Sequence, residues 1–350
     1  MPKKPGSSIV YLIIVISVFV LLGLGFMLNS KPSDTSAPLG TDNFVYRKLQ
    51  MGTLVEITVM DGDPEAFDTA TGKAYRKISE LEKLFSSYTP LSDVSQISLG
   101  AGRGPIPADP RVVTVALKAK QVSVLSGGAF DPTIGSLAGL WGFSGEKGYV
   151  PTAEELAEAL PRVDFNKIVI DKEASTIELT ERRVAFNLGG IAKGYIIGEA
   201  VKVLQARGVT RAIIKAGGDM FAFNITGKET RPFKIGIRDP RGTETELIGE
   251  VYLGGGAVAT SGDYERFFMH GGVRYHHILD PKTGLPAMKT RSATVVTQDP
   301  TLADALSTSV FVLGPVKGME LIESMDGVEG VVVGPDGKIT TSSGFEGKIF

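Results

Sequence analysis

The sequence predicts an α+β fold, in which mixed and largely antiparallel sheets pack against helices. Segments typical of strands and of helices are interleaved without the steady β–α–β alternation of a doubly wound sheet. Two pairs of short runs, 167–171 with 176–180 and 330–334 with 338–342, flank polar turns as the strands of β-hairpins do. No G-x-G-x-x-G or G-x-x-x-x-G-K-[ST] string is present, which argues against the common nucleotide-binding α/β folds.

The N-terminal region predicts one transmembrane helix. Residues 9–28 carry no charged side chain, and at about 1.5 Å per residue they span the roughly 30 Å of a hydrocarbon core. Two lysines within residues 1–8 predict a cytoplasmic N-terminus, so the rest of the chain is expected on the outer (periplasmic or extracytoplasmic) side of the cytoplasmic membrane. A cleaved signal peptide is the main alternative. Residues 29–43, rich in Pro, Ser, Thr and Gly, are expected to be a flexible tether.

Residues 44–350 are expected to form one catalytic domain with two lobes, because no second linker, charge block or internal repeat divides them. A strand is predicted within 45–60. An Asp-Pro pair begins each of the helices predicted over 63–85 and 109–128, and the second ends at a Gly-Gly pair. A capping box, Thr followed three residues later by Glu, predicts a third helix from residue 152.

The composition excludes several functional classes. The chain has no Cys, which rules out disulfides, thiolate metal sites and a cysteine nucleophile, and its 3 His argue against a multi-histidine metal site. Lys and Arg total 37 against 39 Asp and Glu, so no net positive charge favours nucleic acid. Glycine is over-represented: the chain has 43 glycines, about 12 % of its residues, whereas about 7 % is usual. Many lie in loops where a backbone could approach a ligand closely.

The first candidate cluster is the strand-to-helix junction FNLGGIAKG. Its paired glycines, 189 and 190, expose main-chain N–H groups at a helix start, where an anion is favoured. Lys193, one turn into the helix, can place an ammonium beside a phosphate. The alternative is a tight turn followed by a solvated lysine.

The second cluster is TLADALSTSVFVLG, which predicts a buried helix. Asp304 and Thr308 are four residues apart, so a carboxylate and a hydroxyl share one face and could hold a hard cation such as Mg²⁺. The alternative is an Asp near the helix start and a Thr that bonds its own backbone.

The third cluster runs from ATSGDY to YHHILDPKTG. Ser261 offers a hydroxyl, and His276 and His277 lie near Asp280, so a general base close to a carboxylate is possible. A hydrogen-bonded structural histidine and a Ser/His/Asp hydrolase triad both remain open, although no G-x-S-x-G elbow supports the triad. Trp141, the only tryptophan, could be a wall for a planar ring or a packing residue.

Together and in this order, these strings resemble the ApbE family of FAD:protein FMN transferases. The resemblance extends from Met51-Gly52-Thr53 through SSYTPLSDVSQIS, AFDPTIG with LWGF, NLGGIAKGY, KAGGDMF, ATSGDY, YHHILDPKTG and ADALSTSVFVLG. It implies an ApbE-like two-lobed domain that binds FAD with Mg²⁺ and transfers FMN to a Thr or Ser hydroxyl of an acceptor protein, releasing AMP. The implied acceptor is a membrane redox subunit with a D-G-x-[ST]-G-A-[ST] type sequence.

The resemblance also implies which residues form the site. The metal would be held by the Asp304 and Thr308 side chains and the Gly190 carbonyl oxygen. His277 would assist acid–base chemistry at the acceptor hydroxyl, with Asp304 as the second catalytic residue. The residues implied to contact FAD are Met51, Tyr88, Ala129, Phe130, Asp131, Asn187, Lys193 and Ile278.

Two departures from the family pattern stand out. The family commonly has Asp where this chain has Asn187, which removes one negative charge from the implied site. Many members are anchored as lipoproteins through a Cys, whereas here the predicted helix would contact membrane lipid. Two other functions remain alternatives: a Mg²⁺-dependent FAD pyrophosphatase that releases FMN and AMP, and a non-catalytic, membrane-tethered flavin-binding module.

Overall fold

The computed structural model describes residues 43–60, 64–143, 148–227 and 232–350. The transmembrane helix predicted over 9–28, and all of the tether except its last residue, lie outside the described residues. Among the residues that are described, no helix is both long and apolar enough to cross a membrane. The described residues belong to one compact unit, whose first strand begins at Asn43.

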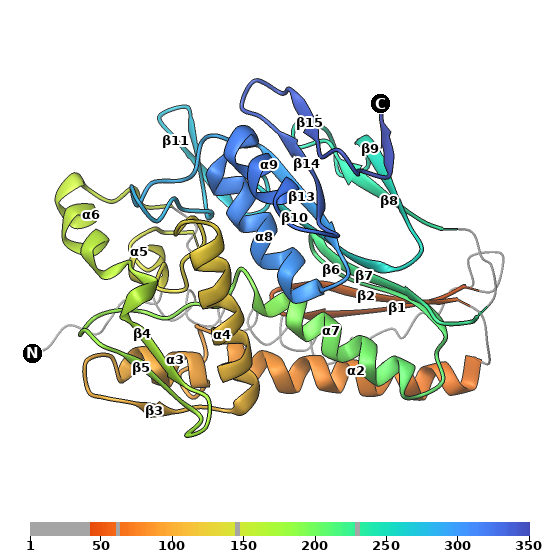
Figure 1. The fold of residues 1–350 in the computed structure, drawn as a ribbon, viewed down its shortest axis with the longest axis horizontal. Coiled ribbons are helices and arrows are strands. Elements are labelled where there is room, and N and C mark those ends of the chain that lie inside the picture. The colour runs from red at the N-terminus through yellow and green to blue at the C-terminus, as the bar shows by residue number, and fades with distance from the viewer. Residues whose placement is uncertain (1–42, 61–63, 144–147, 228–231) are drawn as a thin grey trace, which may run out of the picture. The chain divides into compact units, whose positions relative to one another are not determined.

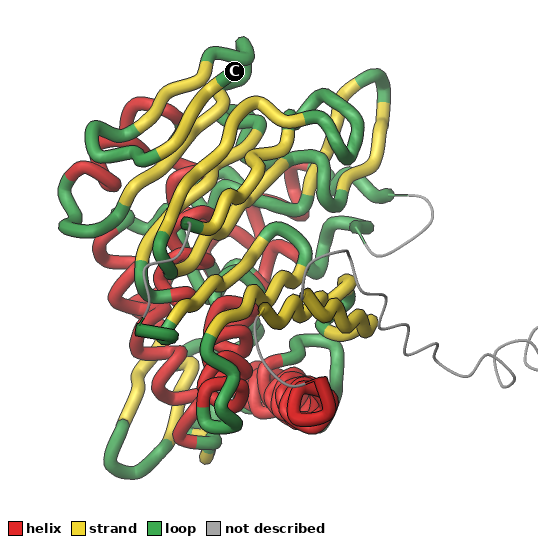
Figure 2. Tube along the Cα trace, turned by 90° about the vertical axis from the view of Figure 1, so that its right-hand side faces the viewer, coloured by secondary structure: helices red, strands yellow, loops and turns green. Residues whose placement is uncertain are grey.

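An eight-stranded sheet forms the centre of this unit (Figure 1). Every neighbouring pair of its strands is antiparallel, which confirms the predicted α+β class. Figure 2, with strands in yellow, shows them side by side and α2 nearly end-on. In order across the sheet the strands are β1 (Asn43–Gln50), β2 (Thr53–Met60), β6 (Arg211–Ala216), β7 (Asp219–Asn224), β10 (Gly256–Gly262), β13 (Ser292–Thr297), β14 (Glu329–Val333) and β15 (Ile339–Thr341).

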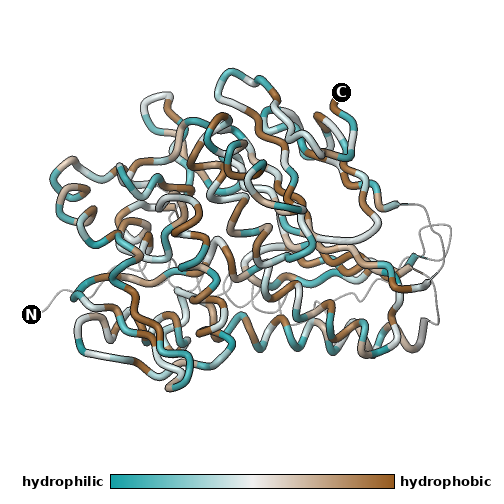
Figure 3. Tube along the Cα trace, viewed as in Figure 1, coloured by the Kyte–Doolittle hydropathy of each residue, from teal (hydrophilic) through white to brown (hydrophobic). Residues whose placement is uncertain are grey.

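Helices cover one face of the sheet. They are α2 (Pro64–Phe85), α7 (Ala192–Gln205) and α8 (Pro300–Leu313), which pack in that order, while α9 (Pro315–Glu323) packs on β14. The hydropathy of α2 alternates along its length (Figure 3), as expected of a helix with one buried face. The apolar residues predicted at helical spacing in α2 are all buried: Phe67, Ala70, Ala74, Ile78, Leu81 and Phe85. Asp63, expected to cap this helix, lies outside the described residues.

A smaller sheet packs on the other face of the central one. It contains β16 (Gly347–Ile349), β9 (Leu247–Leu253) and β8 (Phe233–Arg238), in that order. Apolar side chains that alternate along β8 and β9 contact the outer face of β7 and β10, and together they form a second, separate core. The middle strands of the central sheet are therefore covered on both faces, whereas the edge strands β1 and β15 are more exposed.

The remaining elements flank the helical side. They include α3 (Asp93–Leu99), α4 (Pro110–Leu125), α5 (Gly135–Ala138), α6 (Ala153–Ala159), the short 3₁₀ turns η1 (Leu160–Arg162) and η2 (Phe165–Lys167), and the sheet of β3 (Ile106–Pro107), β5 (Thr176–Leu179) and β4 (Ile168–Asp171). The predicted hairpins are confirmed as β4–β5 and β14–β15. The capping box at α6 is also present. A further hairpin consists of β11 (Phe267–His270) and β12 (Val273–His276).

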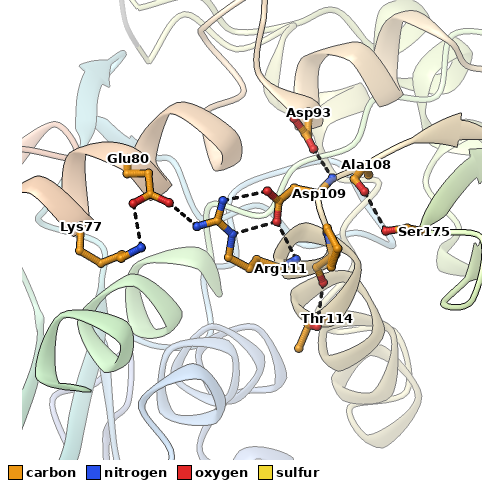
Figure 4. Close-up of polar contacts among 9 residues, drawn as sticks. Lys77, Glu80, Asp93, Ala108, Asp109, Arg111, Thr114 and Ser175 are labelled. Atoms are coloured by element: carbon orange, nitrogen blue, oxygen red, sulfur yellow. Dashed lines mark hydrogen bonds and ion pairs between the residues drawn. The ribbon is translucent and has the colours of Figure 1, made fainter. Parts of the chain in front are cut away.

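The start of α4 shows how sequence signals fix these flanking elements. The Asp109 side chain accepts from the N–H of Arg111, which confirms the predicted cap, and the Arg111 guanidinium also bonds Asp109 and Glu80 of α2 (Figure 4). The Asp109 N–H in turn donates to Asp93 over 2.5 Å. At its other end α4 stops before Gly127 and Gly128, both at positive φ as predicted.

Candidate active site

Asp304 lies in the first half of α8 and is buried, with only 3 % of its surface exposed. The main-chain N–H of Gly194, at the start of α7, donates to Asp304 Oδ2 over 2.9 Å, and the N–H of Lys193 also bonds this carboxylate. A Cβ on Gly194 would lie 2.0 Å from the Pro300 carbonyl oxygen, so only glycine permits this approach of α7 to α8. We expected the N–H groups of Gly189 and Gly190 to favour an anion at this helix start. The Gly189 N–H instead donates to the Asn187 side chain. The N–H groups that bond Asp304 belong to Lys193 and Gly194, where the helix dipole favours a carboxylate.

Lys193 and Asp219 complete a charge cluster around Asp304, in which the two carboxylates are buried and the lysine is half-buried. The Lys193 ammonium forms an ion pair with Asp219 at the first residue of β7, and 32 % of the Lys193 side chain remains exposed. Burial, followed by the negative charge of Asp219, raises the pKa of Asp304 to about 7. Burial alone would lower the pKa of Lys193, but attraction to Asp219 and then to Asp304 outweighs it and raises that pKa. Two carboxylates thus share one ammonium.

Thr308 and Gly190 lie next to each other although 118 residues separate them in the sequence. An ideal Cβ on Gly190 would be 3.2 Å from Thr308 Oγ1 and 3.1 Å from the ring of Phe130. The Ser261 hydroxyl lies 2.9 Å from that of Ser307 and 3.3 Å from that of Thr308, so it holds Thr308 from the neighbouring strand β10. The structure therefore brings together the three residues expected to bind metal, on α8 and at the start of α7.

The oxygen atoms of this site are chemically varied. Within the described part of the chain, no three His, Asp or Glu side chains form a group that could hold a metal. Any cation beside Asp304 would therefore also need hydroxyl or carbonyl oxygens, which Thr308 and Gly190 offer. Such a mixed, hard set of oxygen donors fits Mg²⁺, which commonly keeps part of its shell for water or substrate phosphate.

The two adjacent histidines have different environments. His276 is buried with its ring edge-on to Phe311, and burial lowers its pKa to about 4, so it is the structural one of the pair. His277 follows β12, and its Nδ1 lies 3.3 Å from the Arg266 carbonyl oxygen. A carbonyl only accepts, so this contact requires the proton on Nδ1 and leaves Nε2 as an acceptor. Burial, then the charge of Arg266, lowers the pKa of His277 to about 3.

The hydrolase triad that the sequence left open is not formed. The Ser261 hydroxyl contacts Ser307 and Thr308 rather than a histidine. The Asp280 carboxylate accepts from the N–H of Lys282 in its own turn. Ser261 and Asp280 therefore have separate contacts and form no triad with a histidine.

The loop that contains Ala129, Phe130 and Asp131 lies beside Asn187. The Asn187 N–H donates to the Pro132 carbonyl oxygen over 2.7 Å, and its side chain accepts from the N–H of Gly189 over 2.7 Å. The buried Asp131 carboxylate accepts from Thr133 and from the N–H of Phe165, and burial raises its pKa. Asp131 therefore shapes the loop through contacts within the protein.

The other expected FAD contacts lie on three separate segments. Met51 is in the β1–β2 turn at a φ of 53°, and its N–H donates to Glu82. Tyr88 follows α2 with 76 % of its surface exposed, so its ring is open to a ligand. Ile278 is buried just after His277, where its carbonyl accepts from Ala287. Within the described residues, no hydrogen bond or ion pair joins these three residues to Asp304.

Trp141 packs within the protein, which was the second of the two roles considered for it. Its surface is 3 % exposed, and its indole N–H donates to the Gly284 carbonyl oxygen over 3.0 Å. The ring stacks on Phe143 and packs against Tyr275 of β12, each with centroids 5.6 Å apart. This aromatic cluster fixes the β11–β12 hairpin that leads into His277.

Sequence reasoning did not assign two residues of the site. Asp219 stands in the string KAGGDMF, and the Gly-Gly-Asp turn that ends β6 was the available signal. Ser261 was noted only as a hydroxyl, because its contact with Thr308 depends on the packing of β10 against α8. A cavity of about 290 Å³ between β12, the following loop and the end of α8 does not include Asp304, Lys193 or His277 among its lining residues.

The chain matches a known protein family and several of its members. The profile of the ApbE family matches residues 51–332. An FAD:protein FMN transferase of Treponema pallidum (strain Nichols) is 31 % identical over 357 residues, which cover 98 % of this chain and 96 % of the relative. One from Klebsiella pneumoniae (strain 342) is 30 % identical over 308 residues, covering 87 % and 93 %.

Solved structures agree with this similarity. The ApbE protein of Thermotoga maritima superposes with a TM-score of 0.78 at 35 % identity, covering 86 % of this chain and 97 % of that one. The flavin transferase ApbE from Vibrio cholerae gives a TM-score of 0.74 at 27 % identity, with the same shares covered. Each aligned region contains nearly all of the neighbour and most of this chain.

Proposed function

The chain belongs to the ApbE family, and from this premise we infer that it is an FAD:protein FMN transferase that works at the site around Asp304. The observation that carries the assignment to this site is the cluster of the buried Asp304 and Asp219 with Lys193, beside Gly190 and Thr308. Buried carboxylates with a perturbed pKa are costly and are characteristic of functional sites. FAD is the substrate, and a protein hydroxyl is the acceptor.

We further propose that Mg²⁺ binds to the Asp304 carboxylate, the Thr308 hydroxyl and the Gly190 carbonyl oxygen. When both are ionised, the Asp219 and Asp304 carboxylates carry one more negative charge than Lys193 neutralises. This charge and the hard oxygen donors fit a divalent cation. When bound, Mg²⁺ would neutralise charge on the FAD pyrophosphate. Gly194 orients the Asp304 carboxylate, and Ser261 orients the Thr308 hydroxyl, so both donors are positioned before substrate arrives.

The proposed reaction transfers the phosphoryl group of the FMN half of FAD to the acceptor hydroxyl. The acceptor oxygen forms a bond to the phosphorus of the FMN half, and the bond from that phosphorus to the bridging oxygen of the AMP half breaks. The acceptor hydroxyl loses its proton, for which His277 Nε2 is the proposed acceptor because the contact of Nδ1 with the Arg266 carbonyl oxygen leaves Nε2 unprotonated. Such a transfer depends on alignment and charge neutralisation more than on a protein nucleophile.

The remaining FAD contacts follow from where the residues lie. The exposed Tyr88 ring can stack on a planar ring of the dinucleotide. Phe130 borders Gly190 and Asn187 borders Gly189, so both can contact the part of FAD next to the pyrophosphate. Met51, Ala129, Asp131, Lys193 and Ile278 are proposed to complete the binding site.

The proposed acceptor is a membrane redox subunit that carries a D-G-x-[ST]-G-A-[ST] type sequence. The charge-free run 9–28 supports a single-pass anchor in the cytoplasmic membrane, with the catalytic domain on its outer side. A tethered enzyme would be held near a membrane-bound acceptor, which raises the rate of encounter.

Product analysis tests this function. The full-length chain in detergent is mixed with FAD and Mg²⁺, with and without an acceptor domain, and AMP, free FMN and protein-bound flavin are measured. Transfer predicts AMP and bound flavin in equal amounts, and only when acceptor is present. Equal release of free FMN and AMP without acceptor would identify a pyrophosphatase, and FAD binding with no products would identify a binding module.

A further inference from the structure

Arg266 and His277 form a cross-strand pair at the end of the β11–β12 hairpin. Phe267 pairs with His276 in the ladder, and one step outward the His277 N–H donates to the Arg266 carbonyl oxygen over 3.0 Å. Directly opposed residues of antiparallel strands project to the same face, and successive residues alternate between faces. Arg266 and His277 therefore share one face of the hairpin, while the buried His276 lies on the other.

The Arg266 side chain has no anionic partner among the described residues. It is exposed, and within the described residues no hydrogen bond or ion pair involves its guanidinium group. Its neighbours differ, since Arg241 bonds both oxygens of Asp263 and Arg274 pairs with the same carboxylate. An arginine without a partner among the described residues, in a region where two other arginines are neutralised, is available for an external anion.

The charge of Arg266 reaches the active site. It opposes the protonation of both His277 and Lys193, which agrees with the pairing of Arg266 and His277 on one face of the hairpin. An anion with several oxygens would interact favourably with the guanidinium and with the Lys193 ammonium. The planar guanidinium also offers paired N–H donors that match phosphate oxygens.

We propose that Arg266 binds the pyrophosphate of FAD and stabilises the negative charge that forms on the AMP phosphate when it leaves. This inference rests on the proposed function and adds a substrate-contacting residue to it. As the bond between the FMN phosphorus and the bridging oxygen breaks, that oxygen keeps the electron pair and becomes part of AMP. A guanidinium that contacts this oxygen would stabilise the transition state more than the bound FAD, because the negative charge on the oxygen grows as the bond breaks.

The side chain can be tested separately from the hairpin. Both Arg266 contacts with His277 use the main-chain carbonyl, so Arg266→Gln removes the guanidinium and leaves them in place. Lys282→Gln is the matched control, because it removes the same charge from an exposed residue in the loop that follows His277. Arg266→Lys keeps the charge but loses the planar pair of donors.

The measurements are the dissociation constant of FAD, from quenching of flavin fluorescence, and its competition by ADP, which carries the pyrophosphate without flavin. In Arg266→Gln, the affinities for FAD and for ADP are each expected to fall about 10- to 100-fold, as on loss of a charge-assisted hydrogen bond. In Arg266→Lys, both affinities should recover in part. Lys282→Gln should stay within about twofold of wild type, since an exposed charge contributes little. Unchanged FAD binding in Arg266→Gln, equal weakening in Lys282→Gln, or weaker FAD with unchanged ADP would each overturn the proposal.

The binding assay also separates this inference from the proposed function. It requires no acceptor and no turnover, so a chain that binds FAD through Arg266 but forms no covalent flavin would refute only the transferase assignment. Where turnover is present, Arg266→Gln should lower kcat as well as raise KM, because the contact strengthens as AMP leaves. An equal melting temperature for the two Gln variants would confirm that folding is intact.

Discussion

The main-chain N–H of Gly194 and the carboxylate of Asp304, 110 residues apart in the sequence, are joined by a hydrogen bond of 2.9 Å. This bond places the positive end of α7 against the acidic residue of α8. It holds a carboxylate in a buried position where ionisation is unfavourable. A bound cation would offset the free-energy cost of ionising this carboxylate. The proposed metal site thus depends on the contact between two helices.

Asp304→Asn should separate stability from function. An amide oxygen can still accept from Gly194, but it cannot supply the negative charge that Mg²⁺ requires, so we expect activity to fall about 100-fold or more. Because burial disfavours the ionised carboxylate, the metal-free variant should melt at least as high as wild type at pH 8. Thermal melting and AMP release check both parts; a variant that keeps Mg²⁺-dependent activity would exclude Asp304 as a ligand.

The pKa of Asp304, raised to about 7, predicts a pH dependence with a definite sign. The folded, metal-free protein keeps a proton that the unfolded chain releases near pH 4, so its stability should fall as pH rises from about 4 through 7. Mg²⁺ must displace that proton, and its affinity should therefore increase from about pH 6 to 8 and then level off. Calorimetric titration at several pH values measures this; affinity that stays flat across the range would contradict it.

Gly194→Ala should destabilise the contact between the two helices. The added Cβ would lie 2.0 Å from the Pro300 oxygen and 2.9 Å from Asp304 Cβ, so α7 and α8 must move apart, at about 1–3 kcal/mol. Gly72→Ala is the control, because in α2 a Cβ would meet only Arg76 at 3.8 Å. Better helix propensity should make that control more stable by up to about 1 kcal/mol. Urea unfolding compares them, and equal effects would show that the close approach is not required.

Ser261→Ala tests whether Thr308 needs support from β10. Loss of the Ser261 hydroxyl frees Thr308 to rotate, and we expect Mg²⁺ affinity to fall about tenfold while kcat at saturating Mg²⁺ stays near that of wild type. Ser309→Ala is the control. It removes a buried hydroxyl that belongs to α8 itself and donates to the Ala305 carbonyl oxygen of the same helix. If both variants bind Mg²⁺ alike, the contact between Ser261 and Thr308 has no role in metal binding.

The sequence predicted the local parts of the fold well. Helix starts at Asp109-Pro110 and Thr152, the apolar spacing of α2 and two hairpins all depend on neighbouring residues, and each is confirmed. The order of strands in the central sheet, and the second sheet that packs on its outer face, depend on contacts between distant segments. Single-sequence patterns carry little information on such pairings.

The same division applies to the site. The four-residue spacing of Asp304 and Thr308 indicated a shared helical face, and the structure places Gly190 beside Thr308. The ion pair of Lys193 with Asp219 was not predicted, because it joins α7 to the start of β7 through tertiary packing alone. Trp141 had two interpretations until its contacts with Gly284 and Tyr275 decided for packing.

The most direct test of the account is the intact mass of the acceptor. An acceptor domain is incubated with FAD, Mg²⁺ and either the wild-type chain or Asp304→Asn, alongside an acceptor whose target Thr or Ser is replaced by Ala. The account predicts that wild type adds the mass of one FMN to the native acceptor alone, with flavin fluorescence that survives denaturation, and that Asp304→Asn adds none. An unmodified acceptor with wild type, or equal modification by Asp304→Asn, would contradict it.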